Sequence, residues 1–181
     1  MRSLRVFESI SVDGYFTDAH GDMSWAHTHD PEFDDFVAAN ASSGGELLFG
    51  RKTYEMMVSF WPTPIAAQQM PVVAKGMNAA RKYVASRTLA QATWNNTKLL
   101  TGDLVTAVRE LKATDGPGIA ILGSGSIAAQ LGEANLVDEY QFVIVPIALG
   151  GGRTVFSARR PLKLVGERAF KNGNVVVTYA V

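Results

Sequence analysis

The sequence predicts an α/β protein whose central mixed sheet is mostly parallel, carries helices on both faces and ends in an antiparallel hairpin. Strand and helix patterns alternate through the first two thirds of the 181 residues, and strand patterns predominate after that. Alternation of this kind is typical of parallel strands joined by helices that cover the sheet. Near the end of the chain, Asn172-Gly173 lies between two alternating strand patterns and predicts the two-residue turn of a hairpin.

Strand and helix signals justify each element of the first half. Apolar runs predict strands at Leu4–Ser11 and Glu46–Gly50. Asp30 followed by Pro31 is typical of a helix start, so a helix is expected over residues 30–40. The other expected elements of this half are a turn-rich loop over residues 12–25, a helix over Arg51–Phe60, and a loop over residues 61–71, where three prolines occur.

The second half begins with further strand–helix pairs and then becomes strand-rich. Asp103 can cap a helix in which Leu104, Val108 and Leu111 share one face. The apolar run at residues 118–122 predicts a buried strand that leads into a glycine-rich turn. Further strands are expected within residues 78–86 and 97–101, over residues 137–149 and on both sides of the final turn, with a helix over residues 127–136.

Length, charge and composition exclude several classes of protein. A chain of 181 residues is expected to form one domain, residues 1–181. Lys and Arg together number 17, as do Asp and Glu, which argues against sequence-independent nucleic-acid binding. The absence of cysteine excludes disulfides, thiolate metal sites and a cysteine nucleophile. No long apolar run and no signal-peptide pattern occurs, so a soluble cytoplasmic protein without a membrane partner is expected.

Two cations occupy an unusual position in the motif Gly50-Arg51-Lys52-Thr53. The expected helix starts at Arg51, where the helix dipole repels positive charge. One explanation is that an anion binds there, held by free backbone amides and by both cations. The alternative is a solvated helix start at which the cations occur by chance, and the motif alone does not separate the two.

Two further motifs follow predicted strands. Gly123-Ser124-Gly125-Ser126 joins a buried strand to a helix, where glycines and a helix start favour a pyrophosphate. Ala128 breaks the full G-x-G-x-x-G fingerprint, and no acid ends the next strand, so an ordinary dinucleotide fold is disfavoured and a purely structural turn is the alternative. Ser86-Arg87 could grip a phosphate monoester, although a surface arginine is the simpler explanation of this motif alone.

Taken in order, these motifs resemble the dihydrofolate reductase superfamily. The resemblance is closest to the reductase domain of the bacterial riboflavin-biosynthesis deaminase-reductase and to its stand-alone relatives, and it covers almost the whole chain. The stretches that carry it are SISVDGYFTDAHGDMSW, LLFGRKTYEMM, ILGSGSIAAQL and VIVPIALGGGRTVF. The resemblance implies the dihydrofolate reductase-like three-layer fold.

The resemblance also implies NADPH as the cofactor. It assigns Gly50, Arg51, Lys52 and Thr53 to the cofactor phosphates, with Ser86 and Arg87 at the adenosine 2′-phosphate and Gly123, Ser124, Gly125 and Ser126 at the pyrophosphate. The nicotinamide would lie over the first strand, near Val12 and Phe16. Relatives of this type commonly pair through their C-terminal strands, so a homodimer is expected, with apolar surface from residues 140–149 and 175–181.

The proton that accompanies hydride transfer comes from a side chain or from water. The resemblance places Asp30 at the catalytic acid, although an Asp before Pro31 is more commonly an N-cap. Asp13, in SVDG, matches an Asp-Gly pair of the riboflavin-type reductases and could only shape a turn. His27 and His29 could bind a metal with Asp30, but no third strong ligand is evident and no metal is expected.

The expected function is therefore an NADPH-dependent reductase that transfers a hydride to a small heterocyclic substrate, either ribosylamino-pyrimidine-like or dihydrofolate-like. The alternative is a non-catalytic NADPH-binding module, such as a sensor or a partner protein. The acidic residues Glu32, Asp34 and Asp35 suit neither a folate glutamate tail nor a phosphoribosyl group. The deaminase motifs of the bifunctional enzyme are absent.

Overall fold

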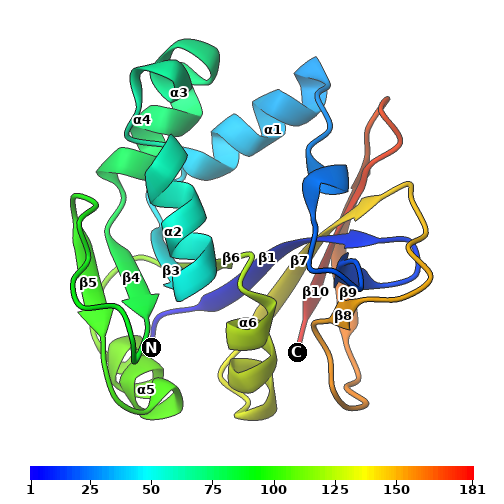
Figure 1. The fold of residues 1–181 in the computed structure, drawn as a ribbon. Coiled ribbons are helices and arrows are strands. Elements are labelled where there is room, and N and C mark those ends of the chain that lie inside the picture. The colour runs from blue at the N-terminus through cyan, green and yellow to red at the C-terminus, as the bar shows by residue number, and fades with distance from the viewer.

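The fold is organised around one eight-stranded sheet with the order β5-β4-β3-β6-β1-β7-β10-β9 (Figure 1). A computed structural model describes residues 1–181. Neighbouring strands from β5 to β7 are parallel, and β10 is antiparallel to both β7 and β9. The strands of this sheet are β1 (Leu4–Ser11), β3 (Glu46–Gly50), β4 (Lys82–Ala85), β5 (Thr97–Leu100), β6 (Ile119–Leu122), β7 (Glu139–Val145), β9 (Lys163–Ala169) and β10 (Val175–Ala180). The mostly parallel sheet and the antiparallel C-terminal hairpin are confirmed.

Helices cover both faces of the sheet, which confirms the predicted three layers (Figure 1). The helices are α1 (Pro31–Ala41), α2 (Arg51–Phe60), α3 (Pro64–Gln69), α4 (Pro71–Ala79), α5 (Leu104–Ala113) and α6 (Gly125–Glu133). Apolar side chains of α5 and α6 pack on one face, and those of α1, α2 and α4 pack on the other. A small ribbon of β2 (Tyr15–Thr17) and β8 (Arg153–Thr154) lies beside the sheet. No helix has the length and apolar character needed to span a bilayer.

The expected loop at residues 61–71 is wrong, because two of its three prolines start helices. Pro64 is the first residue of α3 and Pro71 the first residue of α4. Proline is well tolerated there, since the first amides of a helix have no intrahelical acceptor. The Thr63 hydroxyl caps α3 by accepting a hydrogen bond of 3.2 Å from the Ala66 amide.

Two predicted strand boundaries also differ. The strand expected over residues 137–149 is shorter, since β7 ends at Val145, before Pro146, which has no amide to donate. The final hairpin turns through three residues rather than two. The Phe170 amide donates to the Asn174 carbonyl at 2.9 Å, and the Gly173 amide donates to the Phe170 carbonyl at 3.0 Å.

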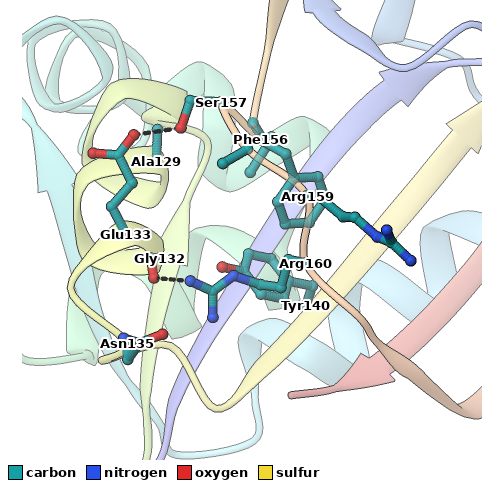
Figure 2. Close-up of a pocket in the computed structure, with 11 residues that line it drawn as sticks. Ala129, Gly132, Glu133, Asn135, Tyr140, Phe156, Ser157, Arg159 and Arg160 are labelled. Carbon is teal, nitrogen blue, oxygen red and sulfur yellow. Dashed lines mark hydrogen bonds between the residues drawn. The ribbon is translucent and has the colours of Figure 1, made fainter.

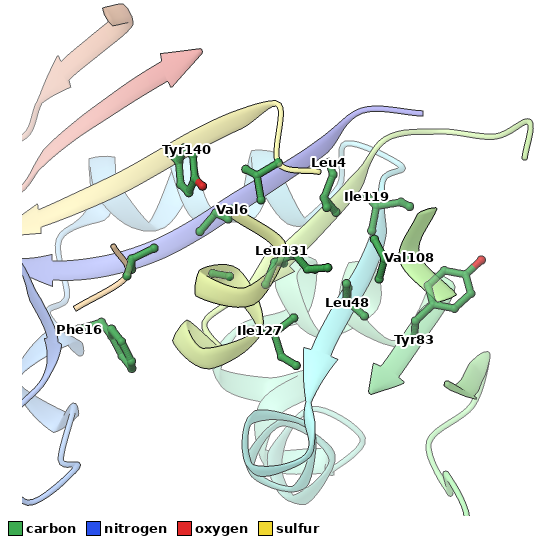
Figure 3. Close-up of a cluster of buried hydrophobic side chains, with 14 of the residues drawn as sticks. Leu4, Val6, Phe16, Leu48, Tyr83, Val108, Ile119, Ile127, Leu131 and Tyr140 are labelled. Carbon is green, nitrogen blue, oxygen red and sulfur yellow. The ribbon is translucent and has the colours of Figure 1, made fainter. Parts of the chain in front are cut away.

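The larger core cluster fills the space between the sheet and the layer formed by α5 and α6 (Figure 3). Leu4 and Val6 of β1, Val108 of α5 and Leu131 of α6 are fully buried there. The helix stripe predicted at Leu104, Val108 and Leu111 therefore faces the core. Burying an aliphatic side chain of this size contributes about 1.5–3 kcal/mol to folding.

A buried polar network fastens the amino ends of the central strands. Arg2 pairs with the Glu46 carboxylate, to which the Tyr83 hydroxyl also donates at 2.9 Å. The Arg2 Nε donates to the Pro117 carbonyl at 2.7 Å. This network holds the amino ends of β1, β3, β4 and β6 together. Their carboxyl ends lie on the opposite side of the sheet.

Lys82 is a second buried cation, and it caps α4. Its ammonium donates to the carbonyls of Met77, Asn78 and Ala80 at 2.8, 3.2 and 2.7 Å, and lies 4.5 Å from the centre of the Trp94 ring. Cations are favourable at the carboxyl end of a helix, where the dipole is negative. The same side chain therefore joins β4 to the end of α4.

We expect the Lys82→Met change to lower the free energy of unfolding by about 2–4 kcal/mol, because three carbonyls would lose their donor. Denaturation in urea would measure this difference. The matched control is Lys98→Met on β5, where the side chain is exposed, and a change within about 0.5 kcal/mol is expected. Equal effects of the two substitutions would contradict the capping role.

Candidate active site

The carboxyl ends of β3 and β6 meet at one edge of the sheet, and each strand leads into a helix. β3 pairs with β6, and β6 pairs with β1. Turns at Gly50 and at Gly123-Ser124 connect these strands to α2 and α6. Ligands of open α/β sheets bind at this edge, outside the carboxyl ends of the strands.

The two helix starts have no side-chain caps. The Ser124 hydroxyl instead accepts a hydrogen bond of 2.8 Å from the Gly50 amide, and donates at 3.2 Å to the Leu122 carbonyl. The Ser124 hydroxyl therefore joins the turn at Gly50 to the turn at Gly123-Ser124 and is not free to cap α6. The first amides of α2 and α6 remain available to an anion, and the positive ends of both dipoles lie close together.

The predicted cations lie beside these helix starts. Arg51 is exposed and bonds Glu55 one turn along α2 at 3.2 Å, while Lys52 is exposed without an ion-pair partner. Because Gly50 pairs with Ala85, the segment that follows β4 emerges next to the start of α2. Arg87, in that segment, is exposed.

Ser86 has a local structural use. Its hydroxyl accepts hydrogen bonds from the Thr88 and Leu89 amides at 3.1 and 3.0 Å, which shapes the turn after β4. The structure thus brings the three motifs to one edge of the sheet, and their contacts with a cofactor stay predictions.

Phe16 and Val12 differ in exposure. Phe16 is 6% exposed and belongs to the core, whereas Val12 is 65% exposed. The Phe16 ring lies so close to the start of α6 that a Cβ atom on Gly125 would come within 2.2 Å of it. Glycine is therefore needed at residue 125 for packing against Phe16. Because the Phe16 ring is buried, its predicted contact with a nicotinamide stays a prediction.

An apolar cavity of about 280 Å³ opens between the sheet and the layer of α1, α2 and α4. Fourteen of its 24 lining residues are hydrophobic. Its main walls are Phe7 of β1, Met56 and Met57 of α2, Trp61 and Met77, with Met23 of the loop before α1. Pockets of this apolar type usually hold small-molecule ligands oriented by a few polar groups.

The wall formed by α1 and α4 depends on Gly76. A Cβ atom at Gly76 would lie 2.3 Å from the Ala41 carbonyl oxygen, so the two backbones are in direct contact. Val37 and Ala41 of α1 and Val73 of α4 line the cavity next to this contact.

Three unpaired buried polar atoms occur among the residues that line this cavity. They are Glu8 Oε2, Asn40 Nδ2 and Gln141 Oε1. Buried polar atoms without partners are rare, because losing water without a replacement hydrogen bond is costly. An amide donor, an amide acceptor and a carboxyl oxygen of the lining residues thus lack partners within the protein.

Glu8 is a buried cavity residue that no sequence motif singled out. It is 2% exposed, and burial raises the pKa of its carboxyl to about 8, although the Ser9 amide lowers it by hydrogen bonding. The signal was present, since Glu8 follows Leu4 and Val6 at a spacing of two and so is also expected to be buried. Its carboxyl group meets the cavity beside Gly123 and Thr53, just past the end of β6, and not on the side where Phe7 lies. An acid on the buried face of a central strand is unusual.

Asp30 caps α1, as the alternative interpretation stated. Its carboxylate accepts a hydrogen bond of 3.1 Å from the Phe33 amide, and the residue is not among those that line the cavity. Its catalytic role stays a prediction, now beside an observed structural use. His27 lines the cavity, while His29 lies 3.9 Å from the Asp34 carboxylate. No group of three His, Cys, Asp or Glu side chains is arranged to hold a metal.

Asp13 shapes loops, as one of its two interpretations stated. Its carboxylate accepts hydrogen bonds from the Leu149 and Gly150 amides and from the Ser11 hydroxyl, which lower its pKa to about 2. The end of β1 is thereby fastened to the loop after β7.

A second pocket lies at the carboxyl end of α6 (Figure 2). Two of its polar side chains already have partners: Arg160 donates to the Gly132 carbonyl, and Ser157 donates to the Glu133 carboxylate. A cation at this end of a helix is stabilising. These contacts hold residues 155–160 against α6, and none of the unpaired buried atoms lies here. The apolar cavity is therefore the better candidate site.

Comparisons with known proteins agree with this arrangement. The chain is 27% identical over 176 residues to the uncharacterized protein YyaP of Bacillus subtilis (strain 168), covering 94% of this chain and 90% of that protein. The structure of the present chain is similar to that of a putative riboflavin biosynthesis protein from Shewanella sp. PV-4, with a TM-score of 0.70, 23% identity and 98% of each chain covered. It is also similar to a pyrimidine reductase-like protein from Corynebacterium diphtheriae, with a TM-score of 0.62, 14% identity, and 99% and 92% of the two chains covered.

The fold is therefore the dihydrofolate reductase-like fold that the motif order predicts. The family model of the RibD C-terminal domain matches residues 2–176 of the 181 residues. This chain is thus a member of the RibD C-terminal domain family.

Proposed function

We propose that this protein is an NADPH-dependent oxidoreductase that transfers a hydride to a small, uncharged heterocycle bound in the apolar cavity. The observation that carries the proposal is the cavity with three unpaired buried polar atoms, at the edge of the sheet where two helix starts lack caps. Membership of the RibD C-terminal domain family supports a reductase-type activity. A single domain and a cytoplasmic location remain parts of this proposal.

The residues at the helix starts fit a dinucleotide phosphate. Gly50 to Thr53 and Gly123 to Ser126 would hold the cofactor through backbone amides that no side chain caps. Arg87 would meet the 2′-phosphate from the turn after β4, beside the start of α2. When bound there, NADPH supplies the hydride.

The charges around the cavity favour an uncharged substrate. Arg5 lines the cavity, but it is paired with Glu139 of β7. No other Lys or Arg lines the cavity, so a phosphate group or the carboxylates of a folate tail would meet no free cation. Asn40 and Gln141 can instead recognise the ring N–H and C=O groups of a neutral heterocycle.

We also propose a homodimer, formed along β9. The predicted surface on residues 140–149 is not available, because β7 lies between β1 and β10 and its apolar side chains Tyr140, Phe142, Val143 and Val145 are buried. β9 is an edge strand on which Leu164 is 48% and Val165 is 52% exposed. An open edge of this kind is suited to pairing with a second copy.

Cofactor preference tests the first part of the proposal. We expect Arg87→Ala to weaken NADPH binding by ~10-fold or more, the equivalent of about 1.5–3 kcal/mol for a phosphate contact, and to leave NADH binding almost unchanged. Quenching of the three tryptophans on titration would measure both affinities. The matched control is Arg81→Ala, at the opposite end of β4, which should leave both affinities unchanged. Equal binding of NADPH and NADH by the unaltered protein would contradict the 2′-phosphate assignment.

Substrate class is tested by turnover. The loss of nicotinamide absorbance would be followed with neutral pterins, quinones and nitro heterocycles, and with dihydrofolate and the phosphorylated pyrimidine of riboflavin synthesis. We expect consumption with a neutral member, because the cavity has no unpaired cation for a charged one. Turnover confined to the charged members would contradict the assignment. Tight NADPH binding without any turnover would favour the non-catalytic module.

Assembly is tested by light scattering at micromolar concentration. We expect the mass of a dimer, and we expect Val165→Lys to shift it towards the monomer by placing a charge in the paired edge. Val72→Lys is the control, since Val72 of α4 is equally exposed at 52% and lies away from the edge. A monomer before any substitution would exclude pairing along β9.

A further inference from the structure

We propose that Glu8 is the acid that protonates the substrate, an inference that rests on the proposed reductase function. Glu8 lines the apolar cavity from the central strand β1, and its Oε2 atom has no hydrogen-bond partner. Burying a carboxyl group with an unpaired oxygen costs folding free energy, and a buried polar group of this kind is therefore a candidate for a functional role.

The position of Glu8 joins the two parts of the site. An ideal Cβ atom placed on Gly123 would lie 3.9 Å from Glu8 Oε1 and 3.7 Å from Thr53 Oγ1. The carboxyl group is therefore next to the glycine-rich turn of α6 and the first turn of α2, where the cofactor is proposed to bind. A proton donor for a reductase needs this location, beside the substrate and close to the source of hydride.

The carboxyl group is neutral at neutral pH. Burial in a site with little water disfavours the charged form and raises the pKa of the carboxyl group to about 8, so the protonated form predominates. The ionisable groups of the neighbouring elements are Arg5, which is paired with Glu139, His27 in the loop before α1, and the exposed Arg51 and Lys52 at the start of α2. None of them forms an ion pair with Glu8, so only the Ser9 amide favours the carboxylate form, and burial outweighs it.

In the proposed step, a polarised C=N bond of the substrate would accept a hydride at carbon, and its π electrons would move to nitrogen. Glu8 would give its proton to that nitrogen as its O–H bond breaks. The two electrons gained by the substrate would come from NADPH, which would become NADP⁺, and the Glu8 carboxylate would regain a proton from solvent when the product leaves.

The Glu8→Gln variant tests the step, because glutamine keeps the size and the hydrogen-bonding capacity but has no acidic proton. With a neutral substrate that the unaltered protein reduces, we expect kcat to fall by ~100-fold or more. The affinity for NADPH, measured by tryptophan fluorescence, should stay the same. For the unaltered protein, kcat should decline as pH rises above about 8, and the residual rate of the variant should lack this decline.

Each outcome has a defined meaning. Unchanged turnover in Glu8→Gln would overturn the role of Glu8 and leave the reductase function standing. A loss of NADPH affinity equal to the loss of rate would also overturn it, since Glu8 would then act in binding. If Asp30→Asn rather than Glu8→Gln abolishes turnover, Asp30 is the acid. No turnover by the unaltered protein, despite NADPH binding, would overturn the reductase function and this step with it.

Stability against pH provides a test that needs no substrate. The pKa of Glu8 is raised from 4.5 to about 8 on folding, so the folded state binds more protons than the unfolded state between these values. The stability that Glu8 contributes is therefore full below about pH 4.5 and is lost as pH rises through about 8. We expect the urea midpoint of the unaltered protein to fall, relative to that of Glu8→Gln, between pH 5 and pH 8. Parallel curves would show that Glu8 is not a buried neutral acid, which would overturn the proposal.

Discussion

The hydrogen bond from the Gly50 amide to the Ser124 hydroxyl joins two neighbouring strand–helix turns, and the rest of the site depends on that connection. It uses the hydroxyl that would otherwise cap α6, and so it leaves the amides of both helix starts free. The neighbouring Gly123 amide donates to the Phe7 carbonyl at 3.1 Å, which holds this turn beside Glu8 and the proposed cofactor site. These two contacts together set the positions of the proposed anion site and the proposed acid.

Much of the fold could be predicted because its signals are local. Asp103 accepts from the Thr106 amide at 2.8 Å, as its place before the helix stripe indicated, and α2 begins at Arg51 as expected. The positions of the prolines were ambiguous because a proline can end a helix or start one. Thr63 caps the helix that begins at Pro64, but no side chain caps the one that begins at Pro71. Turn length in the final hairpin depended on hydrogen bonds across Phe170 and Asn174, which the Asn172-Gly173 pair does not specify.

The cavity could not be predicted in the same way. Its polar atoms come from Glu8 of β1, Asn40 of α1 and Gln141 of β7, which are far apart in the sequence and share no spacing. Their importance lies in having no partner, and a missing contact leaves no pattern in a sequence. The phosphate motifs were visible because each one follows a strand directly, whereas the identity of the acid depends on burial.

Gly76 does not line the cavity, yet its direct contact with Ala41 sets the distance between α1 and α4 and so the width of the cavity. Every side chain larger than hydrogen at residue 76 would force α1 and α4 apart, since a Cβ atom there would lie 2.3 Å from a carbonyl oxygen. A substitution at this position would therefore change the room available to the proposed ligand without changing any residue that lines the cavity.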